Sequence, residues 1–153
     1  LFLTMTYLRN ARGRPIMLVF SDGVDNASWI GEEAVLQAAR ASEVVVYVVK
    51  ADVGEHLSQT GGALDPGGSS GLSSRMLDEL TELTGGRSVA ASRPDAIGEA
   101  FQGILSEVSA RYLLVFSPDE NASPGWHELR VRVGGGGGVA VRARKGYYVP
   151  PKE

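Results

Sequence analysis

Unbroken apolar runs alternate along the chain with segments in which apolar side chains recur at helical spacing. Residues 16–20 and 44–49 are apolar throughout, and such runs predict strands that are buried on both faces, as in parallel sheets. Helical spacing follows each run, at residues 35–39 and 76–83. A strand, a helix and a second strand of this kind form a βαβ unit, whose crossover is nearly always right-handed.

Two further helices and a third strand complete this part of the prediction. Apolar spacing in residues 1–8 indicates the end of an amphipathic helix. Residues 87–91 are expected to form a short strand, followed by a long helix with one apolar face over residues 97–108. Ser28 and Ser92 are the best-placed N-caps of the helices that follow them. We therefore expect an α/β fold, an open and mostly parallel sheet with helices on both faces.

The pattern changes beyond residue 110. Residues 129–133 and 139–144 alternate between apolar and polar side chains, which predicts antiparallel strands with one solvated face. The run of glycines at 134–138 predicts the loop of the hairpin that joins them. Together with the apolar run at 112–116, these segments predict three antiparallel strands at the C-terminus.

Composition and charge exclude several function classes. With 153 residues and 43% hydrophobic content, the chain fits one globular domain. A net charge of −3 gives no overall attraction to nucleic acid or to an anionic membrane. No apolar run approaches the roughly twenty residues of a membrane helix. The alternation places Arg142 and Arg144 on one exposed strand face, where they would discourage edge-to-edge pairing, so we expect no nucleic-acid partner and no membrane insertion.

Asp22 is the central candidate for chemistry, because it ends the first apolar run and precedes Gly23. Open α/β sheets bind their ligands at the carboxyl ends of their strands. An ordinary acidic turn after a core strand is the alternative interpretation of the same residues. Residues 50–72 form a long Gly/Ser-rich loop after the second strand, and this loop would border Asp22.

The run Leu18-Val-Phe-Ser-Asp-Gly-Val-Asp25 resembles the internal strand of a von Willebrand factor type A (VWA) domain, which ends in Thr/Ser-Asp-Gly. The tail, with Arg111-Tyr-Leu-Leu-Val-Phe-Ser-Pro118 and Val141-Arg-Ala-Arg-Lys-Gly-Tyr-Tyr148, is similar to that of bacterial VWA-related proteins, which are usually exported. The resemblance covers nearly the whole chain. It implies a VWA/Rossmann-like fold, with residues 1–110 as the C-terminal part of the VWA-like domain and residues 111–153 as a three-strand β extension. It also implies an extracytoplasmic location, secreted or periplasmic.

In VWA domains a metal-ion-dependent adhesion site (MIDAS) holds a divalent cation chiefly through Asp-x-Ser-x-Ser and a loop Thr, while the Asp of Ser/Thr-Asp-Gly acts through water. This sequence has no Asp-x-Ser-x-Ser, so only Asp22 carries over as a metal residue. Mg²⁺ takes about six oxygens in a near-octahedral array, so we expect weak Mg²⁺ binding or none by this chain, and binding by its complete parent domain. The chain begins at Leu1 within an expected helix, without an initiator Met, which indicates an N-terminally incomplete fragment.

The resemblance implies a non-enzymatic protein-binding module of the adhesion type. A divalent cation at the carboxyl edge of the sheet would accept an acidic residue of a protein partner, and Asp22 would orient water on the metal. Asp25, Asn26 and Ser28 would line the rim of this site.

Two other functions stay open: a phosphatase-like hydrolytic enzyme using Asp22, and a structural module whose metal site has decayed. Haloacid-dehalogenase-type phosphatases end their first strand in Asp-x-Asp-Gly, and Phe20 stands here where the nucleophilic carboxylate would be. His56 and His127 have no recognisable nucleophile beside them in the sequence, so we expect ordinary surface roles for both. We therefore expect no catalytic residue and no enzymatic activity.

Overall fold

The computed structural model describes residues 1–9, 11, 13–21, 30–51, 74–119, 122–134 and 140–151. Its elements are, in chain order, α1 (Phe2–Leu8), β1 (Ile16–Ser21), α2 (Glu32–Ala41), β2 (Val45–Ala51), α3 (Ser74–Thr84), β3 (Ser88–Ala91), α4 (Pro94–Ser109), β4 (Gly125–Glu128) and β5 (Gly146–Val149). The predicted succession of helices and strands up to α4 is confirmed.

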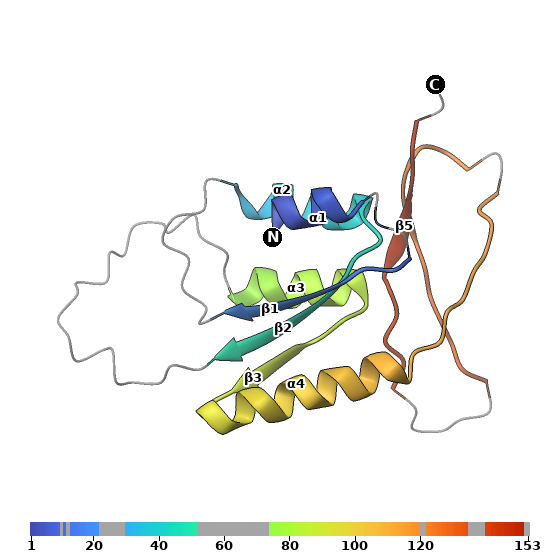
Figure 1. The fold of residues 1–153 in the computed structure, drawn as a ribbon. Helices are drawn as coiled ribbons and strands as arrows, with labels where there is room; N and C mark the ends of the chain where they lie inside the picture. Colours follow the sequence, from blue (N-terminus) through green and yellow to red (C-terminus); the bar gives the residue numbers. More distant parts are fainter. Residues whose placement is uncertain are drawn as a thin grey trace.

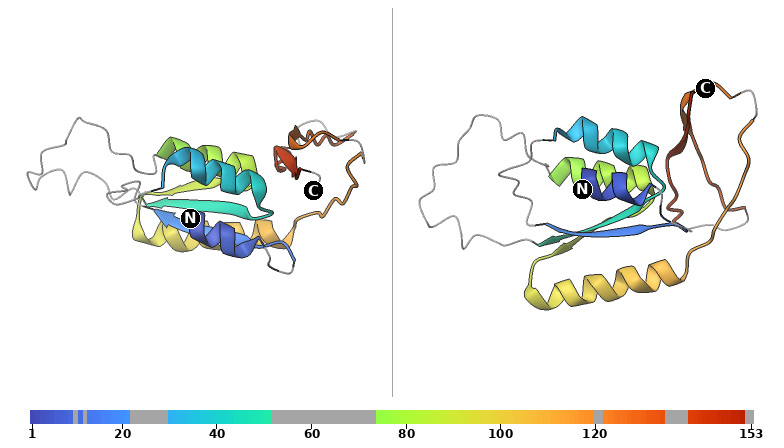
Figure 2. Two further views of the ribbon diagram at one scale, coloured as in Figure 1. Left: turned by 90° about the horizontal axis from the view of Figure 1, so that it is seen from above. Right: turned by 45° about the horizontal axis from the view of Figure 1, so that its top comes forward.

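Three parallel strands form the main sheet, in the order β1-β2-β3. The helices α1, α2 and α3 cover one face of this sheet and α4 covers the other (Figures 1 and 2). Ser21 at the end of β1 lies beside Lys50 in β2, so the carboxyl ends of these strands share one edge. The predicted fold class, an open parallel sheet with helices on both faces and a C-terminal antiparallel pair, is confirmed.

The central strand β2 is buried on both faces. Val46 and Val48 join the cluster formed with α1, α2 and α3, whereas Tyr47 and Val49 join the cluster formed with α4. All four side chains are fully buried, and burial of one such side chain contributes about 1.5–3 kcal/mol. The absence of polar alternation in this run is therefore the result of double burial.

A glycine pair ends α3 and brings its C-terminus against β2. Gly85 has a φ of +79°, which favours glycine over every residue with a Cβ. A Cβ on Gly86 would lie 1.9 Å from the carbonyl oxygen of Val46, so only glycine allows this approach of the two backbones. Thr84 fixes the same junction, because its Oγ1 accepts a hydrogen bond from the N–H of Val46 at 3.1 Å. The predicted helix stop at Gly85 and Gly86 is confirmed.

Both predicted N-caps are wrong, because the helices begin later. The N-cap of α2 is Gly31 instead of Ser28, and that of α4 is Arg93 instead of Ser92. Pro94 explains the second case: the residue before a proline is driven into extended backbone. Arg93 accordingly has φ −143° and ψ 150°, and the helix starts at the proline itself.

The C-terminal part has a hairpin, displaced from its predicted position, and lacks one predicted strand. β4 pairs with β5 in an antiparallel sheet of two strands, and the N–H of Leu129 continues the pairing by donating to the carbonyl of Lys145 at 2.8 Å. Beyond that point, the described residues of 129–133 and 139–144 are not assigned to strands. Residues 112–116 are likewise outside any strand, so the prediction of a strand there is wrong.

Close packing at Gly146 accounts for the position of the hairpin. A Cβ at this glycine would lie 2.3 Å from the carbonyl oxygen of His127 and 2.4 Å from the Trp126 ring. The pairing of β4 with β5 therefore lies at Gly146, where the absence of a side chain permits this contact. The division of the chain into residues 1–110 and 111–153 stays a prediction.

The junction between α3 and β2 yields a stability prediction. Gly86→Ala places a methyl group against the Val46 carbonyl, so we expect the free energy of unfolding to fall by about 3 kcal/mol or more. Gly98→Ala is the matched control, because nothing lies within 4 Å of its Cβ position and alanine is the better helix former, by about 0.5–1 kcal/mol. Urea unfolding followed by circular dichroism measures both. Equal stability of the two variants would contradict the close approach.

Candidate functional site

The sequence-predicted site lies at the end of β1, just beyond the described part of the chain. Asp22, Asp25, Asn26 and Ser28 are outside the described residues, as are His56 and residues 52–73. The strand ends at Ser21, so Asp22 follows the carboxyl end of β1 in the sequence. Among the described residues, the strand register places Lys50 beside Ser21 at this edge.

Lys50 forms a polar cluster near the carboxyl end of β2. Its Nζ lies 2.7 Å from Oδ1 of Asp78 and donates hydrogen bonds to Oγ of Ser74 at 2.8 Å and to the Ser74 carbonyl at 3.2 Å. An ammonium group has three donors and no acceptor, and these contacts use all three. Lys50 therefore fastens the first turn of α3 to β2 and has no free lone pair for proton abstraction.

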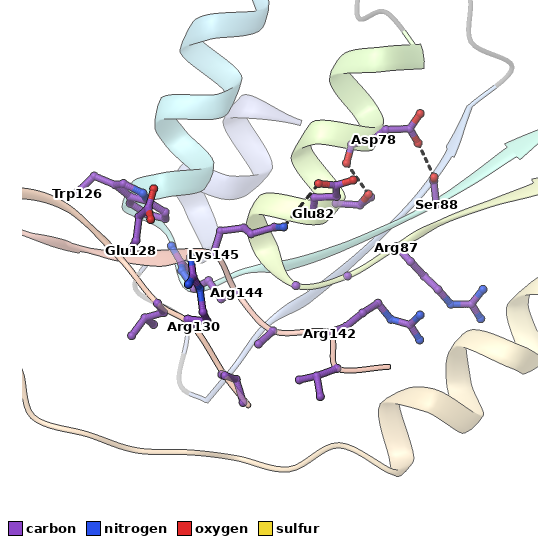
Figure 3. Close-up of a pocket in the computed structure, with 17 residues that line it drawn as sticks. Asp78, Glu82, Arg87, Ser88, Trp126, Glu128, Arg130, Arg142, Arg144 and Lys145 are labelled. Atoms are coloured by element: carbon purple, nitrogen blue, oxygen red, sulfur yellow. Dashed lines mark hydrogen bonds and ion pairs between the residues drawn. The ribbon is translucent and has the colours of Figure 1, made fainter. Parts of the chain in front are cut away.

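Asp78 completes this cluster from the side of α3. The hydrogen bonds from Lys50 and from Ser88 lower the pKa of Asp78 below its usual value, while burial acts weakly in the opposite direction. The Ser88 Oγ lies 2.5 Å from Oδ1 of Asp78 (Figure 3). The cluster thus joins α3, β2 and β3 through an ionised carboxylate whose partners are already in place.

Sequence reasoning missed this cluster, although one signal was present. Lys50 continues the alternation of Val46 and Val48, so its side chain starts on the face that α1, α2 and α3 cover. A charged residue on a covered face requires a partner of opposite charge. The sequence does not show which of the acidic residues on the covering helices provides it.

A second polar region is a groove of about 920 Å³ between α3, the start of β3 and the C-terminal hairpin (Figure 3). Its charged lining residues are Arg87, Arg130, Arg142, Arg144 and Lys145, with Asp78, Glu82 and Glu128. Positive charges thus exceed negative ones in the lining. The ability of the groove to bind a charged ligand depends on how many of these charges already have partners.

Arg144 is bound to the C-terminal end of α2. Its guanidinium donates hydrogen bonds to the carbonyl oxygens of Ala39 at 3.2 Å, Arg40 at 2.9 Å and Ser42. The last carbonyls of a helix have no partner within the helix, and the negative end of the helix dipole attracts a cation. Burial lowers the pKa of Arg144 from its ordinary value, but an arginine remains protonated.

The prediction that Arg144 stands on an exposed strand face is therefore wrong. Arg144 lies just before β5, outside any strand, and its side chain is long enough to reach the end of α2, where carbonyl acceptors replace water. Its guanidinium carbon also lies 5.9 Å from the centre of the Trp126 ring, in the range of a cation–π contact.

Glu107, near the end of α4, is the centre of a second cluster. Its carboxylate accepts hydrogen bonds from the Tyr47 hydroxyl at 2.9 Å, from Arg87 Nε at 2.8 Å and from Arg142 Nη2 at 2.8 Å. Burial raises the pKa of Glu107, but the hydrogen bonds from Tyr47 and Arg87 and the charges of Arg142 and Arg87 outweigh it, so the pKa is lowered overall. Arg142 is half-exposed, but it lies outside any strand, and its charged group is bound. This cluster connects β2, the residue just before β3, α4 and the C-terminal segment.

The described residues offer no assembled metal site. Within the described ranges, no group of three or more His, Asp or Glu side chains could hold a metal ion. The His127 ring stacks on the Tyr147 ring, with 5.1 Å between the ring centres, and its Nε2 is 2.7 Å from the Ser123 carbonyl oxygen. The charge clusters that the structure describes are mutually satisfied, and they can anchor elements to one another.

The chain matches no protein-family model and no curated protein. Among solved structures it is similar to the crystal structure of an uncharacterized membrane spanning protein from Vibrio fischeri, with 21% sequence identity and a TM-score of 0.47. The match covers 68% of this chain and 52% of that one, so this chain spans about half the length of the matched protein. None of the helices in the described ranges is both long and apolar enough to cross a membrane.

The contacts of Arg144 lead to a stability prediction. Arg144→Ala leaves the carbonyls at the end of α2 without their donor, so we expect the free energy of unfolding to fall by about 2 kcal/mol. Arg144→Lys keeps the charge but cannot reach several carbonyls at once, and should recover only part of this loss. Arg132→Ala, on the same hairpin and exposed, is the control and should change stability little. If Arg144→Ala unfolds at the same urea concentration as Arg132→Ala, the helix-end contact contributes nothing.

The lowered pKa values of Glu107 and Asp78 predict a loss of stability in acid. A carboxyl group whose pKa is lower in the folded protein stabilises it fully above the pKa of the unfolded chain, about 4. This contribution is lost as the pH falls through the folded pKa. We therefore expect the free energy of unfolding to decrease as the pH falls below about 5, with a shallower decrease for Glu107→Gln.

Urea unfolding at a series of pH values measures this slope. Glu99→Gln, an exposed change on the same helix, is the matched control and should keep the slope of the original chain. A Glu107→Gln variant with the same slope as the control would show that the Glu107 cluster does not contribute to acid sensitivity.

Proposed function

We propose that the chain is part of a non-enzymatic protein-binding module of the VWA type, whose binding face is the carboxyl edge of the parallel sheet. The observation that carries the proposal is the position of β1: it ends at Ser21, immediately before Asp22-Gly23, and runs parallel to β2. Ligands of open α/β sheets bind outside the carboxyl ends of the strands. In the sequence, Asp22 and Gly23 therefore follow the strand end at the edge where a ligand is expected.

In this proposal the complete parent domain holds Mg²⁺ or another divalent cation at that edge, and the metal accepts an acidic residue of a protein partner. Asp22 orients a metal-bound water, and Asp25, Asn26 and Ser28 form the rim. The nearby ammonium of Lys50 supports the proposal, because Asp78 already balances its charge. A cation with its own counter-ion competes less with a divalent metal for the carboxylate of Asp22.

The proposal includes no catalytic residue, no nucleic-acid partner and an extracytoplasmic location. The contacts of three arginines in the groove support the first two, because Arg144 is bound to carbonyls and Arg87 and Arg142 to Glu107. The location rests on the resemblance of the tail to that of exported proteins.

Magnesium titration by calorimetry tests the metal site. One carboxylate cannot supply about six oxygens, so we expect the 153-residue chain to bind Mg²⁺ with a dissociation constant weaker than about 1 mM. A parent protein with Asp-x-Ser-x-Ser should bind it tightly, and Asp22→Asn there should weaken binding about 10–100-fold, as for other residues that act through a first ligand. Asp95→Asn, an exposed change on α4, is the matched control.

Two results would overturn this proposal. One is tight, stoichiometric Mg²⁺ binding by the 153-residue chain alone, and the other is an unchanged affinity of the parent after Asp22→Asn. Phosphatase turnover that disappeared in Asp22→Asn would replace the binding module with the enzymatic alternative. Partner binding should depend on the metal and be abolished by a chelator.

A further inference from the structure

Two arginines of the groove share a single carboxylate oxygen. Nε of Arg87 and Nη2 of Arg142 each lie 2.8 Å from Oε2 of Glu107, so the two nitrogens are separated by no more than twice that distance. Two like charges this close repel each other, and one carboxylate offsets only one of them. The hydrogen bonds of Glu107 are thus in place, whereas the charges around it do not cancel.

Arg111 adds a third positive charge to this cluster. Its guanidinium carbon lies 5.7 Å from the centre of the Tyr47 ring, whose hydroxyl donates to Oε1 of Glu107. Arg111 also donates a hydrogen bond at 3.1 Å to the carbonyl of Gly85, which lines the groove. Within the described part of the chain, no other carboxylate forms an ion pair with the three arginines. Three guanidiniums and one carboxylate leave an excess of two positive charges.

The other acidic residues of the groove do not supply the missing negative charge. Asp78 and Glu82 have cationic partners of their own, at 2.7 and 3.8 Å. Glu128 lies at the opposite end of the groove from Arg87 and Arg142 (Figure 3). The remaining source of a counter-charge is an anion from outside the chain.

Arg87 and Arg142 both keep hydrogen-bond donors for such an anion. An arginine side chain has five N–H groups, and each of these two uses one of them within the described ranges. Their side chains are 31% and 49% exposed, and both line the groove. Because Glu107 already holds the two guanidiniums in place, a ligand loses less affinity to the ordering of side chains.

We propose that the groove binds a doubly charged phosphate group, that of a phosphate monoester or of inorganic phosphate, between Arg87 and Arg142. A phosphate monoester carries a charge of about −1.5 to −2 at neutral pH, which matches the excess of two positive charges. The planar guanidinium donates two parallel hydrogen bonds to phosphate oxygens. The site lies at the amino end of β3 and not at the carboxyl edge of the sheet, so it is independent of the metal and of Asp22.

Titration of the 153-residue chain with phosphate, followed by NMR of its backbone amides, tests this site. At constant ionic strength, we expect inorganic phosphate to shift the amide signals of Gly86, Arg87 and Ala143, with a dissociation constant on the order of 1 mM. The amides of α1 should not move. Dimethyl phosphate carries a single negative charge and should bind at least about threefold more weakly.

A comparison of two ligands identifies the source of the phosphate group. Tighter binding of phenyl phosphate than of inorganic phosphate would support the site and assign a phosphorylated organic molecule to it. Tighter binding of inorganic phosphate would support the site and assign the free ion.

Three variants separate phosphate binding from a purely structural role of the cluster. Arg142→Gln should weaken phosphate binding at least about tenfold. Arg132→Gln is the matched control, because Arg132 is exposed and does not line the groove, and it should leave the affinity unchanged. Glu107→Gln removes the competing negative charge but keeps an oxygen acceptor, so it should tighten binding about threefold. A structural role alone does not predict changes of affinity in opposite directions.

Arg87→Gln keeps the test decisive if Arg142→Gln fails to fold, and it should weaken binding to a similar extent. The absence of shifts up to about 30 mM phosphate would overturn the proposal. So would an affinity that both arginine variants leave unchanged, weaker binding by Glu107→Gln, or equal affinities for dimethyl phosphate and inorganic phosphate.

Discussion

The central strand β2 is covered by helices on both faces, so every group that reaches it must be apolar or find a partner inside the protein. Val46 and Val48 meet the first condition. Tyr47 meets the second, because its hydroxyl donates to Glu107. The backbone at the end of α3 also packs closely on this strand, because Gly86 lies directly against the Val46 carbonyl. Helices α3 and α4 cover the two faces of this strand, and β3 pairs with its edge.

The C-terminal hairpin is attached to this core mainly by arginines. Arg144 satisfies the carbonyls at the end of α2, and Arg142 shares the carboxylate of Glu107 with Arg87. A guanidinium is suited to both tasks, because its donors lie in a rigid plane and its charge is permanent. These contacts also explain why the groove beside the hairpin is rich in charge without being a free cationic surface.

The proposed binding module places a metal and an acidic partner at the carboxyl edge of the sheet, beside the balanced pair of Lys50 and Asp78. The fold itself does not decide this function, since one α/β arrangement supports many functions.

The sequence by itself determined the α/β order, the doubly buried strand at 44–49 and the helix stop at Gly85, because periodicity and glycine conformation are properties of a few neighbouring residues. It also predicted the strand that precedes Asp22, and β1 ends at Ser21. Only the tertiary structure decided that Arg144 binds the end of α2, a contact between residues about a hundred positions apart. The same holds for the Glu107 and Lys50 clusters, whose members come from separate elements. Alternation shows on which side a side chain starts, whereas the partner of a long charged side chain depends on how the elements pack.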